Sequence, residues 1–171
     1  FEKNYNNEKI LNFVHKQIKK NQLNDFRLKI LNHINKNENC RYSYFKISKP
    51  YLEAIVGNEL VMQKKINLSI QLPEDRDSLL AVHSDVWSGD SPFEVVVWLP
   101  LVNCFKTKSM YILPANLSSQ FNKKISKKNY QNSEKVFQLI KKKIKWIKIN
   151  YGQVLIFNQS LPHGNRVNKE T

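Results

Sequence analysis

Two histidines and one aspartate have the residue types and spacing of a metal-binding group: His83 and Asp85, separated by one residue, and the distant His163. An H-x-D pair with a later histidine is the ligand set of the 2-His-1-carboxylate facial triad. That arrangement holds Fe(II) on one face and leaves the opposite positions open. In a strand, residues i and i+2 point to the same side, so His83 and Asp85 can converge on one ion. His163 follows the strand-like run 152–157 and is placed to supply the third ligand.

The elements that must position these residues are predicted to be short β-strands separated by turn residues. Strands are expected at 41–47, 60–72, 78–85, 94–101, 109–113, 144–149 and 153–158. Many short strands without βαβ units are typical of an antiparallel sandwich or jelly roll. The predicted fold class is therefore mainly β with N-terminal helices, a double-stranded β-helix of the cupin-like kind.

Helical periodicity marks the N-terminal third of the chain. Apolar residues repeat at helical spacing over 7–35, with a break at 21–24. Ser48 as N-cap and Pro50 in the first turn predict a further helix that ends near Gly57. The expected organisation is a single domain, in which a helical segment (1–58) packs on a jelly-roll core (59–171) with a loop and helix inserted at about 115–143.

Composition describes an ordinary water-soluble protein of 171 residues, with 41% hydrophobic and 25% charged residues. Cys40 and Cys104 are far apart and form no C-x-x-C pattern, so they are expected to be free thiols in a reducing compartment. No apolar stretch approaches the roughly 18 residues of a membrane helix. These features predict a cytoplasmic protein without a membrane partner.

The net charge of +14 favours anionic partners. The lysines concentrate between Lys123 and Lys148, but the chain is also rich in Asn and Ile, a bias that AT-rich coding sequence produces by itself. Compositional bias and solvated faces are therefore preferred to a dedicated polyanion site. A nucleic-acid partner is not expected.

The run from Val61 to Pro114 resembles the non-haem Fe(II)/2-oxoglutarate oxygenases of the phytanoyl-CoA hydroxylase type. Residues 63–67 (QKKIN) are similar to the strand before the iron-binding strand of these enzymes, and residues 83–98 (HSDVWSGDSPFEVVVW) are similar to the iron-binding strand and its successor. Residues 107–114 (TKSMYILP) match a later strand that ends in a proline-containing turn. The string is also similar to oxygenases from sporadic carbohydrate-biosynthesis clusters of bacteria.

The resemblance implies Fe(II) and the cosubstrate 2-oxoglutarate, with His83, Asp85 and His163 as the iron ligands. It places further residues at positions that contact the cosubstrate or the substrate. Trp98 could equally be a core residue, and Trp87 could be a packing residue at the end of the iron-binding strand. The residues implied for 2-oxoglutarate are Gln63, Asn67, Trp98, Asn165 and Arg166, and those implied for the substrate are Trp87 and Tyr111.

One position departs from the family pattern. These enzymes pair the distal carboxylate of 2-oxoglutarate with an arginine about ten residues beyond the second histidine, because a guanidinium can pair it bidentately. Arg166 follows His163 too closely to match that position, and the given sequence stops at Thr171. The natural polypeptide is therefore expected to continue and to supply the arginine. Otherwise the role falls to Arg166 or to a lysine such as Lys108.

The implied function is an Fe(II)- and 2-oxoglutarate-dependent dioxygenase that uses O2 to hydroxylate a small molecule. A sugar, a sugar derivative of surface-carbohydrate biosynthesis or an anionic compound is the expected substrate, on the family association alone. Two alternatives remain open: a non-enzymatic jelly-roll module that binds carbohydrate, and an oxygenase directed at nucleic acid.

Overall fold

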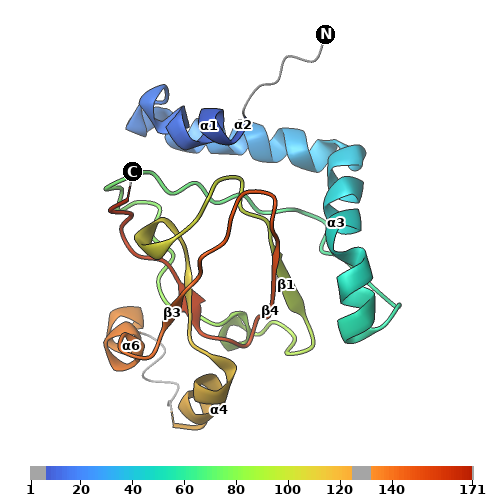
Figure 1. Ribbon diagram of the computed structural model, residues 1–171, viewed down its shortest axis with the longest axis vertical. Coiled ribbons are helices and arrows are strands. Elements are labelled where there is room, and N and C mark those ends of the chain that lie inside the picture. Colours follow the sequence, from blue (N-terminus) through green and yellow to red (C-terminus); the bar gives the residue numbers. More distant parts are fainter. Residues whose placement is uncertain (1–6, 125–131, 171) are drawn as a thin grey trace. The chain divides into compact units, whose positions relative to one another are not determined.

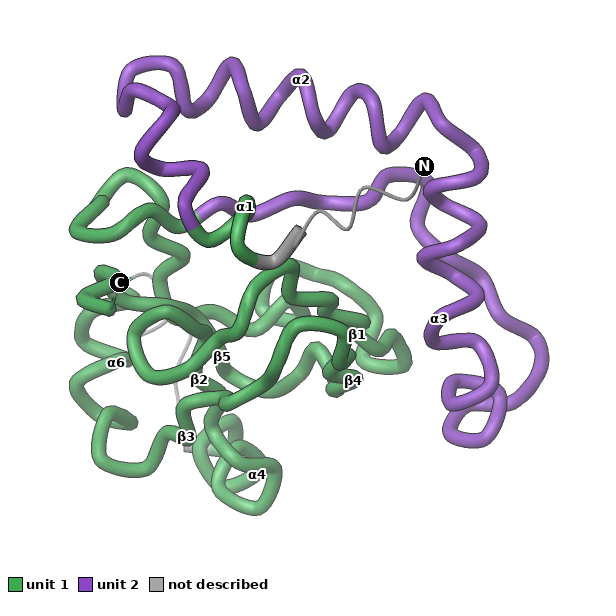
Figure 2. Tube along the Cα trace, turned by 45° about the horizontal axis from the view of Figure 1, so that its top comes forward, with its two compact units in different colours: residues 1–12, 71–171 green, residues 13–70 purple. Residues whose placement is uncertain are grey.

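The computed structural model describes residues 7–124 and 132–170. The chain divides into two compact units, one formed by residues 13–70 and the other by residues 1–12 and 71–171 (Figure 2). The boundary after Ile70 differs from the predicted one at 58, and the first twelve residues belong to the larger unit. In the larger unit the Asn12 side chain accepts a hydrogen bond from the Lys108 ammonium group at 2.7 Å.

The unit of residues 13–70 is built mainly from two helices, α2 (Leu23–Lys36) and α3 (Glu38–Val56), preceded by short 3-10 turns at Val14–Lys16 and Lys20–Gln22. Asn37 begins α3, because its side-chain oxygen accepts hydrogen bonds from the backbone N–H groups of Asn39 and Cys40. Residues 57–70 then run back along α2 without regular secondary structure (Figure 2). The Asn35 amide holds them there, bonding both the N–H (2.7 Å) and the C=O (3.0 Å) of Ile66.

The predicted strand at 41–47 is wrong, since these residues lie inside α3. Their alternating aromatics favour a strand locally, but Ser48 and Leu52, four residues apart, are both buried on one helical face. Ser48 is not an N-cap, because its hydroxyl donates to the Phe45 carbonyl within the helix. Pro50 also lies inside α3. Only the predicted end near Gly57 is confirmed, as Gly57 is the C-cap and has φ +91°.

The larger unit contains α1 (Asn7–Phe13, whose last residue falls in the other unit) and two small antiparallel sheets (Figure 1). Strand β1 (Val95–Trp98) pairs with β4 (Leu155–Asn158). Strand β2 (Tyr111–Ile112) lies between β3 (Lys145–Trp146) and β5 (His163–Gly164). Helices α4 (Ala115–Lys124) and α6 (Ser133–Ile140) occupy the predicted insert, of which residues 125–131 lie outside the described residues. Two 3-10 turns, η3 (Asp85–Ser88) and η4 (Lys106–Lys108), complete the unit.

The prediction of a mainly β jelly roll is wrong. Helices account for 44% and strands for 12% of the structure, and the described strands form one sheet of two strands and one of three. The expected strands at 60–72 and 78–85 are absent from the described part of the chain, apart from an isolated bridge at His83 within the second range. An alternating pattern makes a strand only where a neighbouring backbone is available to pair with it. Residues 57–70 instead lie against a helix, and Val61 remains 99% exposed.

The core of the larger unit joins α6 to the central strand β2. Tyr111, Leu113, Val136 and Ile140 are almost fully buried together with Val82, which directly precedes His83. Because Val82 directly precedes His83, the backbone that carries His83 is anchored in the most buried part of the unit.

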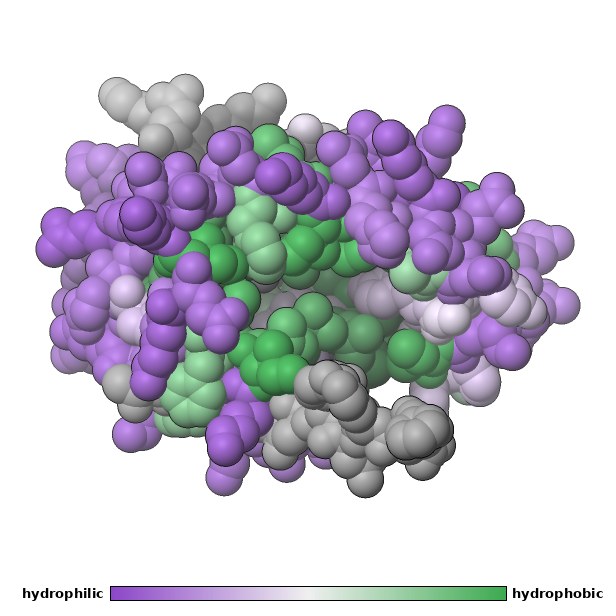
Figure 3. All heavy atoms as spheres, turned by 90° about the horizontal axis from the view of Figure 1, so that it is seen from above, coloured by the Kyte–Doolittle hydropathy of each residue, from purple (hydrophilic) through white to green (hydrophobic). Residues whose placement is uncertain are grey.

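On the surface, hydrophobic side chains (green) are exposed between hydrophilic ones (purple), as Figure 3 shows for one face. Among the described residues, no helix is long and apolar enough to span a bilayer.

Both cysteines are free, as predicted. Burial raises the pKa of the Cys104 thiol to about 11, against a smaller lowering effect of nearby Lys108. Since the thiolate is the reactive form, only about one Cys104 in a thousand is reactive at pH 8. We expect iodoacetamide to alkylate Cys104 at least about tenfold more slowly than the half-buried Cys40, as measured by peptide mass spectrometry. Equal rates in the folded protein would contradict the buried position of Cys104.

Candidate metal centre

His83 and His163, eighty residues apart in the sequence, face each other across an antiparallel bridge. Each donates its backbone N–H to the carbonyl of the other, at 2.9 Å and 2.8 Å. Directly opposed residues of antiparallel segments project their side chains to the same face. The two imidazole rings consequently lie 4.2 Å apart between centroids. Backbone pairing therefore brings together the two nitrogen donors that the sequence separates.

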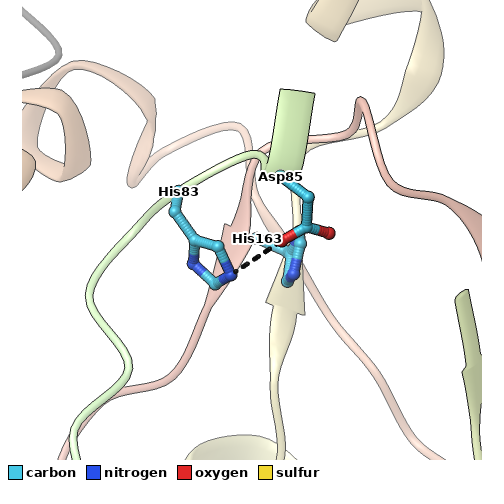
Figure 4. A group of neighbouring side chains, drawn as sticks. All are labelled: His83, Asp85 and His163. Atoms are coloured by element: carbon cyan, nitrogen blue, oxygen red, sulfur yellow. Dashed lines mark ion pairs between the residues drawn. The ribbon is translucent and has the colours of Figure 1, made fainter. Parts of the chain in front are cut away.

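Asp85 reaches the same place because the chain turns immediately after the bridge. Ser84 is extended, and the 3-10 turn η3 begins at Asp85. The Gln159 carbonyl holds this turn by accepting hydrogen bonds from the Asp85 N–H (3.2 Å) and the Ser84 hydroxyl (3.1 Å). The Asp85 carboxylate thus lies 3.5 Å from Nε2 of His83, and Figure 4 shows it directed toward the two rings.

The three side chains present their donor atoms to one common point. One ligand atom from each of His83, Asp85 and His163 can be chosen such that all three lie within 4.8 Å of one another. This convergence is the arrangement that the sequence predicted for a 2-His-1-carboxylate group, although the predicted strand carrying His83 and Asp85 is reduced to one bridge and a turn. The i, i+2 spacing is therefore compatible with convergence in more than one backbone conformation.

Hydrogen bonds fix the orientation and the tautomer of both imidazoles. Nδ1 of His83 lies 2.9 Å from the Ala81 carbonyl, and Nδ1 of His163 lies 2.8 Å from the Leu161 carbonyl. A carbonyl can only accept, so each Nδ1 carries the proton and each Nε2 has its lone pair available. Metal-binding histidines use the same device, in which an outer hydrogen bond selects the tautomer and fixes the ring. The matching bonds at two independent residues are typical of a prepared metal site.

Burial distinguishes the two histidines. His163 is 5% exposed, and this burial is the main cause that lowers its pKa. The nearby His83 lowers the pKa further. The hydrogen bond to Leu161 and the charge of Asp85 raise it, but by less. A lowered pKa favours the neutral imidazole, which is the form that binds metals. The side chains of His83 and Asp85 are 29% and 25% exposed, so solvent reaches the group from their side.

Sequence reasoning missed the residues that support this group. Ser84 and Gln159 are buried, and the Gln159 side chain also donates to the Ser91 carbonyl. The Phe157 ring meets the His163 ring edge-on at 5.1 Å. Gln159 and Phe157 belong to the run that precedes His163, but no spacing rule distinguishes a supporting glutamine from a surface one. Only the proximity of its carbonyl to Asp85 reveals its role.

The structure places the residues implied for 2-oxoglutarate in diverse settings. Gln63 and Asn67 are exposed residues of the unit formed by 13–70. Trp98 is half-buried in β1 opposite Leu155. Asn165 is buried and bonds backbone groups of the segment before His83, its oxygen accepting from the Leu80 N–H at 2.7 Å. This bond makes Asn165 a support for that segment.

Arg166 is engaged by helix α6. Its guanidinium donates to the Glu134 carboxylate at 2.7 Å and stacks 4.3 Å from the centre of the Phe137 ring. The hydrogen bond from Arg166 is the main cause that lowers the pKa of Glu134. Both contacts are with residues of α6, so Arg166 links the segment after His163 to this helix. The positive charge of Arg166 is paired with the Glu134 carboxylate.

The two residues implied for the substrate belong largely to the core. Trp87 packs on Phe121 of α4, with 6.3 Å between ring centroids. Tyr111 is fully buried between Phe137 and Trp146. In the β2–β5 register Tyr111 opposes Gly164 while Ile112 opposes His163, so the Tyr111 side chain projects to the face opposite His163.

The Tyr111 hydroxyl is buried and hydrogen-bonds to no described residue. An unsatisfied buried polar group costs about 1–3 kcal/mol, so removing it should be favourable. We expect Tyr111→Phe to raise the free energy of unfolding by up to about 1 kcal/mol in urea titrations. Tyr42→Phe, on a 62% exposed side chain, is the matched control and should change stability by less than about 0.5 kcal/mol. A destabilised Tyr111→Phe protein would mean that the hydroxyl has a bonding partner.

Comparisons with family models, with curated proteins and with solved structures found no significant match to this chain. The family resemblance noted in the sequence therefore remains an expectation, and the geometry of His83, Asp85 and His163 carries the functional argument.

Proposed function

We propose that this protein is a non-haem Fe(II)-dependent oxygenase that uses 2-oxoglutarate to hydroxylate a small molecule. The observation that carries the proposal is the convergence of His83, Asp85 and His163, with both Nδ1 atoms bonded to backbone carbonyls. Two imidazoles and one carboxylate form the facial ligand set of non-haem Fe(II) oxygenases.

The donor chemistry of the group supports a transition metal. Ca²⁺ and Mg²⁺ prefer sites made of oxygen ligands, whereas imidazole nitrogen favours Fe(II), Co(II), Ni(II) or Zn(II). Asp85 supplies one negative charge, and its partly exposed side chain leaves room for water or small ligands on that side. When bound, Fe(II) together with 2-oxoglutarate would supply the O2 activation needed to oxidise a C–H bond.

The protein itself would hold the three ligand side chains in place and limit their movement. The Ala81 and Leu161 carbonyls keep the Nδ1 proton in place, and the Gln159 carbonyl keeps Asp85 at the start of η3. Phe157 limits the rotation of the His163 ring by edge contact. Such outer contacts hold the geometry of a metal site and typically change its affinity 10–100-fold.

The assignment of 2-oxoglutarate rests on the sequence resemblance around residues 61–114. Arg166 is paired with Glu134, so we do not assign it to the distal carboxylate of the cosubstrate. A sugar or sugar derivative as substrate rests on the same resemblance. The oxygenase resemblance and the carbohydrate-binding alternative both assumed a jelly-roll fold, which the structure does not have, so the proposal is supported by the donor geometry and not by the fold.

Turnover of the cosubstrate tests the proposal. Protein reconstituted anaerobically with Fe(II) should form succinate from 2-oxoglutarate after O2 is admitted, even slowly without a primary substrate. The reaction should disappear in His83→Ala and persist in His33→Ala, in which the replaced histidine lies exposed on α2. Tight metal binding without any succinate would overturn the oxygenase and retain only a metal-binding protein.

A further inference from the structure

The charges of the chain are segregated along the sequence. Between Gln71 and Glu94 there are six carboxylates and a single basic residue, Arg76. Between Val95 and Asn168 there are twelve lysines and Arg166, against one carboxylate, Glu134. A compositional bias toward lysine does not by itself remove carboxylates from a stretch of this length. The segregation therefore calls for a structural explanation.

In the described part of the basic stretch, lysines are concentrated at residues 141–148, where the chain leads from α6 into β3. Both elements are labelled in Figure 1. The turn after α6 is held by hydrogen bonds to the last residues of the helix, from the Lys143 N–H and the Ile144 N–H to the Ile140 carbonyl. Ile144 and Trp146 then pack on the core, while Lys143 and Lys145 alternate with them and are exposed. The alternation places these two lysines on the outward side of the chain.

Further exposed lysines lie at the ends of this segment and beside it. Lys142 and Lys148 are exposed at either end of this segment. The segment 104–110 lies beside residues 147–149. Cys104 and Ile149 exchange backbone hydrogen bonds, and the Ile147 N–H donates to the Met110 carbonyl. This segment contributes a further exposed lysine, Lys106. We call the group Lys106, Lys142, Lys143, Lys145 and Lys148 the basic surface.

Among residues 7–124 and 132–170, none of these five lysines forms an ion pair with a carboxylate. Glu134, the sole carboxylate of the stretch, is bonded to Arg166 and to Gln138. The lysines of the basic surface thus extend from a hydrogen-bonded backbone, and no carboxylate of the described residues pairs with them.

We propose that the basic surface binds the phosphate backbone of a nucleic-acid duplex. Residues i and i+2 of an extended segment lie about 6.6 Å apart, comparable to successive phosphates along one strand. Trp146, which directly follows Lys145, is half-buried and packs edge-on against Tyr111, which favours a core role over stacking on unpaired bases. Recognition is therefore of backbone charge, without base readout. This proposal is independent of the metal centre.

Edge protection is the competing explanation. Strand β3 is the edge of its sheet, and lysines on edge strands prevent pairing with other chains. That explanation accounts for Lys145 but not for the lysines of the preceding turn or for Lys106. It also predicts no affinity for a duplex beyond that caused by the net charge.

The test compares two variants of equal charge by fluorescence anisotropy with a labelled duplex of about 20 base pairs, with EDTA in every sample. The wild-type chain should bind with a micromolar Kd at 50 mM salt, and log K should fall linearly with log salt, by about 0.9 for each phosphate neutralised. Replacing Lys142, Lys143, Lys145 and Lys148 by Gln should weaken binding at least tenfold and flatten the salt dependence. Lys141 is left unchanged because it lies close enough to Glu134 to affect its pKa.

The matched control replaces four exposed lysines of the other unit, Lys29, Lys36, Lys64 and Lys65, by Gln. It lowers the net charge equally and should weaken binding by less than about threefold. Equal losses in both variants would overturn the proposal, because net charge alone would then explain binding. Absence of wild-type binding, or tighter binding to phosphatidylglycerol vesicles than to the duplex, would also overturn it. Circular dichroism shows whether the quadruple variant is folded. If it is unfolded, the double variant Lys142→Gln/Lys148→Gln takes its place, because both positions lie outside β3. The double variant should bind the duplex about threefold more weakly or worse.

Discussion

His83→Ala should lower the affinity of the protein for Co(II), an air-stable substitute for Fe(II), by more than a hundredfold in titration calorimetry. Loss of an outer hydrogen bond typically costs a metal site 10–100-fold, and loss of a ligand removes a bond to the ion itself. His83 is suited to this test because its side chain is 29% exposed and its backbone, not its ring, makes the bridge to His163. The variant is therefore expected to keep the wild-type fold.

Two further variants make the metal prediction specific. Asp85→Asn keeps the shape of the side chain but removes the negative charge, and it should also weaken Co(II) binding strongly. His33→Ala removes an exposed histidine of α2 and should leave binding unchanged. Retained affinity in His83→Ala, with loss in His33→Ala, would place the metal elsewhere and refute the centre described above.

Gly164→Ala should destabilise the protein by about 3 kcal/mol, the largest stability effect that we expect from a single methyl group. A Cβ at this position would lie 2.8 Å from the Leu80 carbonyl oxygen, 2.9 Å from the Tyr111 hydroxyl and 3.2 Å from the Ala81 carbonyl carbon. Two of these three atoms belong to the backbone, which cannot move aside as a flexible side chain can. The neighbouring segment must therefore shift away from β5.

The shift should reach the metal centre. Leu80 and Ala81 lead directly into His83, and the Leu80 carbonyl also accepts the Asn165 N–H at 2.9 Å. Displacing this segment disturbs the bridge that holds the two imidazoles together. Urea titration should report the lost stability, and calorimetry should report weaker Co(II) binding in the folded protein.

The double variant Gly164→Ala/Tyr111→Phe provides the internal control. It removes the hydroxyl contact but leaves the Leu80 and Ala81 contacts in place, so it should recover only part of the lost stability. Complete recovery would assign the crowding to Tyr111 alone. Wild-type stability in the single variant would show that β5 and the segment before His83 are not packed this closely.

Local sequence patterns predicted those elements whose stability is itself local. The helical periodicity of 7–35 appears as α1 and α2, and β1 and β4 fall within the predicted ranges 94–101 and 153–158. The prediction failed at 41–47, where aromatic alternation favours a strand but Asn37 starts a helix that continues through Pro50. It failed again at 60–72, where the structure has no strand and the Asn35 side chain supplies the hydrogen bonds of Ile66. The predicted jelly roll is wrong because the strands of the described residues pair only into one two-stranded and one three-stranded sheet.

By itself, the sequence determined the types of donor, their i, i+2 spacing and the separation of acidic from basic segments, since these are properties of residue order. Only the tertiary structure decided that His163 meets His83, that both Nδ1 protons are held by carbonyls, and that Arg166 pairs with Glu134. Each of these contacts joins segments through hydrogen bonds and packing that depend on how distant parts of the backbone pair. Such pairing is chosen by the folding free energy of the whole unit, which no local pattern encodes.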